Sequence, residues 1–555
     1  MANIGVGLRW FAAVGLLASF AFASGPYTVG SANTVTADPL VGRPKTMPCV
    51  VPLFSGAQFF NFNVQTFSYT PPAGCPGPWA KVVLTADINV APGIQFDRTA
   101  NFWLGPYNIF FGTTAEPGQN NGPSWHVEKD LTEYSAIFNT AQSGQADIGN
   151  TLCCGLTSII FASSQVEFYP VATGQVAPKV ADVVLPLSAG TSGGTVALSS
   201  TASTLSGTFS FPTNVLSAYL DIYSQSQSSD EFWQTCVPND VSGELFSCGN
   251  TGFRETEVTI DGQPAGVAPV SPWIFTGGID PFLWFPLPGV QTLNFIPARV
   301  DLTPFAGLLS NGQQHTVALS VFNANNYFSD TASLLLYTDH GSTQVSGGMT
   351  SNTLTAAPSP VVAEKLNLGN AITGTVNVSS NRQYSISGYV NTSAGKVTTQ
   401  VNRTVHFVNA QYFNISNTKF VQNIRLTSTV SSQTKTWWGS AKPTEQDETL
   451  QFPLTLNISQ IVQPNGNINQ TTTSHQTYGV TDQGSAGGKL TSFSLLSNDG
   501  QQTDTLVFDS SFNLLGNMNQ SSSQTYASSD ANGTYVCKLA AANNALMSFD
   551  PTCAK

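Results

Sequence analysis

Short runs of alternating apolar and polar residues recur along the chain, separated by Gly, Pro and Asn. A period of two places the apolar side chains of a strand on one face and the polar side chains on the other. Long stretches with the 3.6-residue period of an amphipathic helix are absent. The pattern therefore predicts an all-β protein built from stacked antiparallel sandwiches. The clearest strands are expected at 81–90, 217–224, 256–261, 316–322 and 333–338.

Two changes in composition divide the 555 residues into units of domain size. Small and polar residues fill 186–210, which we interpret as a linker or long loop, and a second such stretch lies near 340–362. We therefore expect one domain at 40–185, a second at 205–345 and a β-rich C-terminal domain at 362–555.

Asn-x-Ser/Thr acceptor sequences occur only after residue 376. An N-glycosylated asparagine must lie on an accessible surface of a secreted protein. The C-terminal third is thus expected to be a separate domain that carries the glycans, although chance clustering in a region rich in Asn, Ser and Thr would give part of the same pattern. The eight asparagines are Asn377, Asn391, Asn402, Asn414, Asn457, Asn469, Asn519 and Asn532.

The first residues have the organisation of a signal peptide, which we place at 1–23. Arg9 is the only early charge, an apolar stretch follows at 10–22, and Ala21-Phe22-Ala23 has the small-x-small form of a cleavage site. The stretch is short for a membrane span, and no later segment is apolar for long enough to cross a bilayer. We expect a soluble, secreted, extracellular protein; the alternative is a buried N-terminal helix.

The eight cysteines fit an oxidising compartment. Cys153 and Cys154 are adjacent and cannot easily bridge each other, so one or both are expected to reach a distant partner. No CxxC pair is present, which argues against a zinc site, and we expect no metal. Spacing does not fix connectivity. It suggests the local bridges Cys49–Cys75, Cys236–Cys248 and Cys537–Cys553.

The formal net charge of −12 excludes several classes of partner. A protein that binds nucleic acid needs basic surface to neutralise phosphates, and anionic membranes attract the same basic groups. We therefore expect neither nucleic acid nor membrane as a partner.

Familiar nucleophile systems have little support in the sequence. None of the five histidines lies in an HExxH motif, and no Walker or Rossmann glycine pattern is present. The one GxSxG match, at 190–194, falls in a small-residue segment, whereas a nucleophile elbow needs a strand-to-helix turn. A Ser-His-Asp triad assembled from distant residues remains an alternative. Carboxylates are the obvious catalytic groups.

The most distinctive acidic residue is Asp97, which stands beside Arg98 in a run flanked by Phe96, Phe102 and Trp103, in a chain with only 9% charged residues. Apolar neighbours can desolvate a carboxylate and shift its pKa, although an ordinary structural ion pair would look the same. Other acidic clusters contain Glu116, residues 125–130, Asp230 with Glu231, and residues 253–257.

In their order along the first 340 residues, these motifs resemble those of the peptide-N-glycosidase A family of secreted, acid-active glycoamidases. The resemblance covers well over a third of the chain. The matching runs are Phe96-Asp97-Arg98, 113–117, 125–134, Asp230-Glu231-Phe232-Trp233, Phe253-Arg254-Glu255, Asp261-Gly262, 276–284 and 301–305.

The resemblance implies two eight-stranded jelly-roll sandwiches side by side, with the active site between residues of about 40–185 and about 205–345. It implies hydrolysis of the amide bond between asparagine and the first N-acetylglucosamine of an N-glycan. N-glycosylated peptides or proteins would be the partners, and no cofactor is needed. Phe-Asp-Arg-x-Ala-Asn also resembles the segment of a bacterial glycoamidase that carries its principal aspartate, which implies that Asp97 is the primary catalytic acid/base.

The resemblance assigns the remaining roles less directly. Glu231 is our candidate for the second carboxylate, and Arg98 would stabilise an oxyanion or hold Asp97 in place. The chain departs from the family pattern at 106–112, which lacks an expected Glu and Arg, at Cys236, where an Asn is expected, and at Asn250, near a second catalytic Glu of the bacterial enzyme. The candidate substrate-binding residues are Glu116, Asp230, Arg254, Trp103, Trp233 and Trp284.

A non-catalytic glycan-binding or cell-surface adhesion protein is the main alternative function, because β-sandwiches serve both purposes. A serine hydrolase with a dispersed triad is a third. Asp97 within Phe-Asp-Arg favours the enzyme, whereas the departures at 106–112 keep the glycan-binding alternative open.

Overall fold

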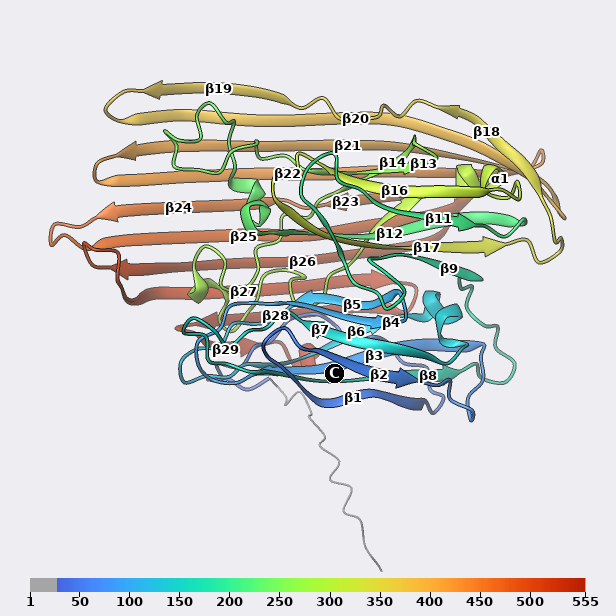
Figure 1. The fold of residues 1–555 in the computed structure, drawn as a ribbon, viewed down its shortest axis with the longest axis horizontal. Helices are drawn as coiled ribbons and strands as arrows, with labels where there is room; N and C mark the ends of the chain where they lie inside the picture. Colours follow the sequence, from blue (N-terminus) through green and yellow to red (C-terminus); the bar gives the residue numbers. More distant parts are fainter. Residues whose placement is uncertain (1–26, 555) are drawn as a thin grey trace, which may run out of the picture.

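The alternating segments form strands throughout residues 27–554, the part of the chain that this computed structural model describes (Figure 1). Four of the five predicted strands lie within observed strands, the fifth, at 256–261, extends one residue past β13, and the all-β prediction is confirmed. The predicted signal peptide at 1–23 lies outside the described residues. Helical structure in the described part is limited to short segments: η1 (Thr132–Phe138), η2 (Ser228–Asp230), η3 (Trp233–Thr235), η4 (Pro281–Trp284), η5 (Thr303–Phe305), α1 (Ala306–Leu309) and η6 (Pro551–Ala554).

The first sandwich contains eight strands in two four-stranded sheets, ordered β1-β8-β3-β6 and β2-β7-β4-β5. The first strand of this sandwich pairs with the eighth, so both ends of this stretch of chain lie in one sheet. The inward-facing aromatic and aliphatic side chains of both sheets form one core. The strands are β1 (Cys49–Phe59), β2 (Val64–Tyr69), β3 (Trp79–Val90), β4 (Thr99–Leu104), β5 (Tyr107–Thr113), β6 (Ser124–Asp130), β7 (Gln142–Ile148) and β8 (Ile160–Pro170).

The second sandwich repeats this order, with sheets β10-β17-β12-β15 and β11-β16-β13-β14, and β9 added beside β17. The interpretation of 186–210 as a linker is wrong, because β10, β11 and the end of β9 lie there and hydrogen-bond to longer strands. The strands are β9 (Val183–Leu187), β10 (Val196–Leu198), β11 (Leu205–Ser210), β12 (Val215–Gln227), β13 (Glu255–Ile260), β14 (Gln263–Pro269), β15 (Ala298–Asp301), β16 (Gln314–Phe322) and β17 (Tyr327–Thr338).

The remaining strands form one twelve-stranded antiparallel sheet, which lies behind the second sandwich in Figure 1. We call it the large sheet. Several of its strands exceed the usual 3–10 residues. The strands are β18 (Ser346–Asn352), β19 (Val361–Leu368), β20 (Ile372–Thr392), β21 (Gly395–Ser416), β22 (Lys419–Trp438), β23 (Thr444–Gln451), β24 (Leu454–Val462), β25 (Ile468–Ala486), β26 (Lys489–Phe508), β27 (Leu514–Asp530), β28 (Gly533–Ala542) and β29 (Ala545–Phe549).

The two faces of the large sheet differ. The inner face packs on the second sandwich, and side chains of both share one core. Arg382 reaches from this face into the sandwich and donates to Glu255 at 2.6 Å and Glu257 at 2.8 Å. The register of the strands turns six of the eight acceptor asparagines to the opposite, outer face, where side chains are exposed or half-buried. These six are Asn377, Asn391, Asn402, Asn414, Asn457 and Asn469.

Three disulfides connect the suggested cysteine pairs. Cys153 and Cys154 are exposed thiols whose Sγ atoms are 3.0 Å apart. The expectation that one of them reaches a distant cysteine is wrong, because the other six cysteines pair with one another. The bridges are Cys49–Cys75, Cys236–Cys248 and Cys537–Cys553.

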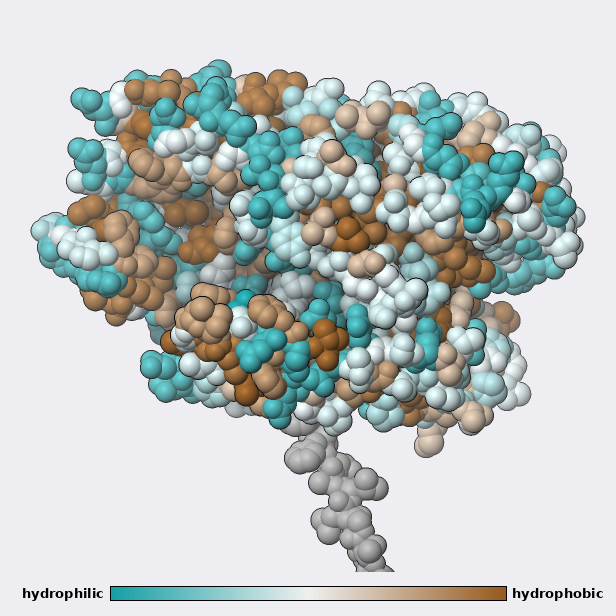
Figure 2. Space-filling view, viewed as in Figure 1, coloured by the Kyte–Doolittle hydropathy of each residue, from teal (hydrophilic) through white to brown (hydrophobic). Residues whose placement is uncertain are grey.

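Residues 27–554 include no helix with both the length and the apolar character needed to span a bilayer. The exposed surface is a mixture of polar and apolar patches, and it is hollowed between the first sandwich and the elements above it (Figure 2).

Candidate active site

Two carboxylates meet where β4 begins and β5 ends. These strands pair with Thr99 opposite Thr113, which brings the residues before β4 next to those after β5. The backbone N–H of Asp97 donates to Glu116 Oε1 at 3.2 Å. Thr114 fixes the same corner by donating its N–H to the carbonyl of Arg98 at 2.9 Å. Asp97 and Glu116 are therefore held side by side by the strand pairing itself.

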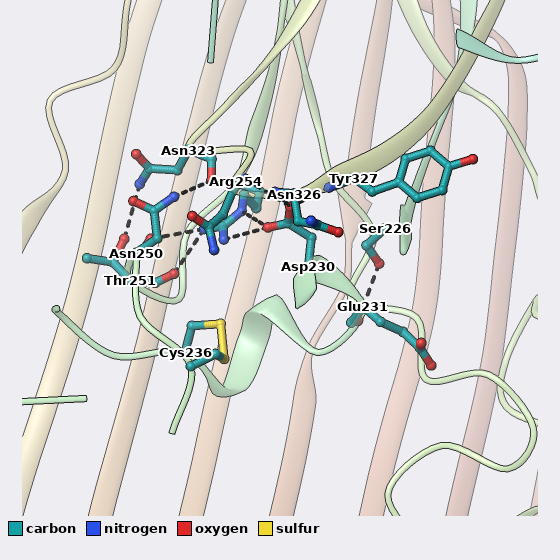
Figure 3. A network of polar contacts seen from close by, with 12 residues as sticks. Ser226, Asp230, Glu231, Cys236, Asn250, Thr251, Arg254, Asn323, Asn326 and Tyr327 are labelled. Carbon is teal, nitrogen blue, oxygen red and sulfur yellow. Dashed lines mark hydrogen bonds and ion pairs between the residues drawn. A yellow bond between two sulfur atoms is a disulfide. The ribbon is translucent and has the colours of Figure 1, made fainter. Parts of the chain in front are cut away.

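Glu231 joins this pair from the second sandwich. It follows β12, whose end is tied to the first sandwich: the Gln227 side chain donates to Thr99 Oγ1 at 2.9 Å, and Thr99 Oγ1 donates to Gln225 Oε1 at 3.1 Å. The Glu231 side chain makes no hydrogen bond or ion pair within residues 27–554, and Figure 3 shows it pointing away from the polar network around its neighbour Asp230. Three carboxyl groups thus converge at the junction of the two sandwiches.

Their environment favours protonation. Burial, followed by the charges of Glu116 and Glu231, raises the pKa of Asp97 well above its usual value. Burial raises the pKa of Glu116 to about 7, partly opposed by the hydrogen bond from the Asp97 N–H. Burial also raises the pKa of Glu231 to about 7. Nearby like charges disfavour a fully ionised cluster, so it retains protons near neutrality. All three residues remain partly exposed, as a site for substrate requires.

Arg98 lies beside the cluster but is not paired with a carboxylate. Its Nε and Nη2 atoms donate to Gln95 Oε1 at 3.1 and 2.6 Å, and its guanidinium lies 5.8 Å from the ring centre of Phe96. Its positive charge still lowers the pKa of Asp97, although burial and the two glutamates outweigh it. Arg98 therefore places a positive charge near the three carboxyl groups, and its hydrogen bonds to Gln95 fix the orientation of its guanidinium group.

A glycine turn closes one side of the site, and sequence analysis assigned it no role. Gly277 has φ +86°, and a Cβ atom at this position would collide with the Glu116 carboxylate. Thr276 Oγ1 donates to the carbonyl of Thr114 at 2.7 Å, which holds the turn against Glu116. The consecutive glycines of Thr-Gly-Gly were the available signal, because glycine permits both positive φ and close approach.

Asp230 and Arg254 were predicted to bind substrate, and the structure contradicts this. Their side chains are fully buried and joined by hydrogen bonds of 3.1 and 2.8 Å. The other Asp230 oxygen accepts three successive backbone N–H groups, at 2.8–3.1 Å (Figure 3); they belong to Asn325, Asn326 and Tyr327. With all its acceptors occupied, Asp230 holds the loop that follows β12 and has no contact left for a ligand.

The three predicted tryptophan platforms are also wrong. Trp103, Trp233 and Trp284 are 1%, 0% and 2% exposed. Trp233 and Trp284 pack in the core shared by the second sandwich and the large sheet, and Trp103 is covered by the turn at Gly193. Trp284 donates its indole N–H to the carbonyl of Gly278 at 3.0 Å, which supports the glycine turn from behind. An exposed aromatic ring beside the site is that of Phe96, which is 58% exposed and immediately precedes Asp97.

A cavity of about 1030 Å³ lies elsewhere, between the N-terminal segment, the first sandwich and the large sheet. Several of its charged groups are paired: Arg43 donates to Glu128 at 2.7 Å, and His126 bonds Asp87 at 2.8 Å and Glu128 at 3.1 Å. Although burial opposes protonation of His126, these carboxylates raise its pKa to about 9. Mutually neutralised groups of this kind hold the segment in place, in contrast to the unpaired acids of the candidate site.

Two other expectations concern reactive groups. Ser192 of the GxSxG match lies in an exposed turn between β9 and β10, without the helix that a nucleophile elbow requires. Among the described residues, no group of three or more His, Cys, Asp or Glu side chains is arranged to hold a metal ion.

Comparisons with known proteins identify relatives of this chain. Residues 54–354 match the family described as peptide N-acetyl-beta-D-glucosaminyl asparaginase amidase A. Peptide-N4-(N-acetyl-beta-glucosaminyl)asparagine amidase A of Prunus dulcis is 28% identical over 389 residues, covering 66% of this chain and 67% of the almond protein.

Two solved structures share weaker similarity. PNGase F, a glycosylasparaginase from Flavobacterium meningosepticum, is 13% identical with a TM-score of 0.36, over 52% of this chain and 96% of that chain. PNGF-II is 12% identical with a TM-score of 0.37, over 53% of this chain and 65% of that chain.

Proposed function

The chain belongs to the peptide N-acetyl-beta-D-glucosaminyl asparaginase amidase A family, and we propose that it hydrolyses the amide bond between an asparagine side chain and the first N-acetylglucosamine of an N-glycan. The substrate would be an N-glycosylated peptide or protein. The products would be a glycosylamine and a peptide in which asparagine has become aspartate. The observation that carries this proposal is the convergence of Asp97, Glu116 and Glu231, all without a basic hydrogen-bonding partner among the described residues, at the junction of the two sandwiches.

Amide hydrolysis needs an activated water, stabilisation of the oxyanion and a proton for the departing nitrogen. Asp97 has the strongly raised pKa of a group that keeps its proton near neutrality, which suits donation to the leaving nitrogen. Glu231, free of hydrogen bonds and approaching from the opposite sandwich, is placed to take a proton from water. Glu116, held by the Asp97 N–H and the turn at Gly277, would orient the pair.

The positions of the other charged and aromatic groups refine this assignment. Arg98 supplies positive charge near the developing oxyanion, with its orientation fixed by Gln95. Phe96 offers an exposed ring to the sugar. The three tryptophans that were candidate sugar platforms are buried, so they give a glycan-binding role no support.

The test is incubation with a defined Asn-linked glycopeptide in heavy-oxygen water, followed by mass spectrometry. We expect loss of the whole glycan and one heavy oxygen atom in the new aspartate. A glycopeptide that is retained intact by the protein would support the glycan-binding alternative. Cleavage within the glycan, leaving a sugar on asparagine, would refute amide hydrolysis.

We also propose that the protein is secreted and N-glycosylated on the large sheet. The three disulfides support an oxidising compartment. All eight acceptor asparagines have some exposure, and six share the outer face of that sheet. Site occupancy measured on the secreted protein by glycopeptide mapping tests this proposal, and unmodified asparagines throughout would refute it.

A further inference from the structure

The glycine turn at the active site continues into a segment that ends on the large sheet. After Gly277 and Gly278, Asp280 begins η4, and its Oδ1 atom caps this turn by accepting the N–H of Phe282 at 3.0 Å. Asp280 itself is 0% exposed. A buried carboxylate therefore lies three residues from the position that touches Glu116.

The group that faces Asp280 is a second buried carboxyl. Asp504, near the end of β26, is also 0% exposed, and its Oδ1 atom accepts from the Asn517 side chain at 2.8 Å. The Oδ2 atom of each aspartate lacks a donor among the other described residues. The two carboxyl groups lie within hydrogen-bonding reach of each other.

Two adjacent acceptors without donors are costly in a protein interior, and two buried negative charges side by side are costlier still. One proton placed between them resolves both problems, as in other carboxyl pairs that cannot both ionise. Burial and the neighbouring Asp504 raise the pKa of Asp280 to about 8. The other groups that face the pair from β25, β26 and β27 are neutral, namely Gln470, Thr505 and Asn517.

The large sheet holds the same segment at two further points. Gln470 donates from β25 to the carbonyl of Ile279 at 3.2 Å, and Gln520 donates from β27 to the carbonyl of Phe285 at 2.7 Å. These neutral amides hold residues on both sides of Asp280 at every pH. The contact between Asp280 and Asp504 is the titratable one of the three.

We propose that Asp280 and Asp504 share one proton, that this pair anchors the turn bearing Gly277 to the large sheet, and that loss of the proton loosens the turn against Glu116. Asp280 and Asp504 are positioning residues, since neither touches the three carboxyl groups of the candidate site. The large sheet thereby contributes to the shape of a site formed by the two sandwiches. The consequence for catalysis rests on the proposed function; the anchoring does not.

The decisive experiment measures amide hydrogen exchange in residues 276–285 of the full chain at pH 6 and pH 9, expressed as protection factors to remove the intrinsic effect of pH. In the wild type we expect protection to fall by about tenfold or more at the higher pH. In Asp504→Asn the amide can donate to the Asp280 carboxylate at any pH, so protection should be retained at pH 9. Asp504→Ala should lose protection at both values.

Asp499→Asn is the matched control, because Asp499 lies on the same strand and pairs with His475 away from this segment. This variant should behave as the wild type. Equal pH sensitivity in the wild type and Asp504→Asn would overturn the shared proton, whether or not the chain cleaves glycopeptides. If the chain cleaves glycopeptides, KM for a glycopeptide at pH 9 should be lower in Asp504→Asn than in the wild type. An unchanged KM would show that the contact between Asp280 and Asp504 does not affect catalysis.

Discussion

Asp230 and Glu231 are adjacent in the chain but belong to different electrostatic regions. Asp230 is buried, bound to Arg254 and saturated with backbone donors, whereas Glu231 is half-exposed and has no hydrogen-bonding partner among residues 27–554 (Figure 3). Arg382 likewise pairs with Glu255 and Glu257, whereas Asp97 and Glu116 have no salt bridge to a basic side chain among residues 27–554. Acidic side chains whose hydrogen-bonding partners are present hold loops in place. Acidic side chains that lie next to other acids keep protons that they can exchange.

The strongest test of this contrast is Asp97→Asn. An amide cannot deliver the proton that the leaving nitrogen needs, so kcat should fall on the order of 10³-fold. Thermal unfolding should change little, because the Asp97 side chain holds no structural ion pair. Steady-state kinetics on a glycopeptide and a melting curve measure both quantities. Near-native turnover in the purified variant would remove Asp97 from the mechanism.

Glu231→Gln should have the next largest effect, with kcat lower by about 10²-fold because the water loses its base. Asp97 would still be protonated and able to donate. The comparison is sharpest against Glu445→Gln, a carboxylate on the large sheet whose removal should leave kcat unchanged. A Glu231 variant no slower than this control would place the second carboxylate elsewhere, with Glu116 the next candidate.

The change expected in the pH dependence of activity is smaller than these losses of kcat, and its direction is the test. Asp97 must be protonated to donate, so activity is lost as pH rises through its raised pKa, whereas Glu231 must be ionised to accept a proton from water, so activity is also lost as pH falls below a pKa of about 7. The charge of Glu116 contributes to the elevation of the Asp97 pKa, so Glu116→Gln should move the alkaline limb of kcat/KM to lower pH by about one unit. A limb that stays in place, or moves to higher pH, would show that Glu116 does not act on the proton of Asp97.

Arg254→Met should have the smallest effect on turnover per folded molecule, and it completes the contrast. Removing one partner of a buried pair leaves Asp230 uncompensated, and unfolding free energy should fall by about 3–5 kcal/mol. Arg43→Met, which breaks a partly exposed pair with Glu128, is the control and should cost less. Denaturant titration measures the free energy of unfolding of both variants and so distinguishes the two costs. Loss of kcat without loss of stability in Arg254→Met would return this residue to the substrate site.

The sequence predicted the strands and the three converging acids, but for different reasons. The alternation of apolar and polar residues in 81–90 or 316–322 is a local property of the sequence, and the folded strands keep it. Asp97, Glu116 and Glu231 could be grouped only because their motifs occur in the order found in a known family. Burial of Trp103 and Arg254 could not be read from the same runs, since it depends on which face a neighbouring sheet covers. The role of Gly277 could not be predicted for a related reason, because Glu116, which it contacts, is distant in sequence.

The outer face of the large sheet has a consequence for the fate of the protein itself. The asparagines on this face are held in paired strands, so the bond joining any glycan to them lies one side chain from a rigid backbone, on the far side of the sheet from Asp97. A chain with the proposed activity therefore could not remove from itself the glycans carried by this face. Self-processing would require a collision between two molecules, with an initial rate that rises as the square of the protein concentration.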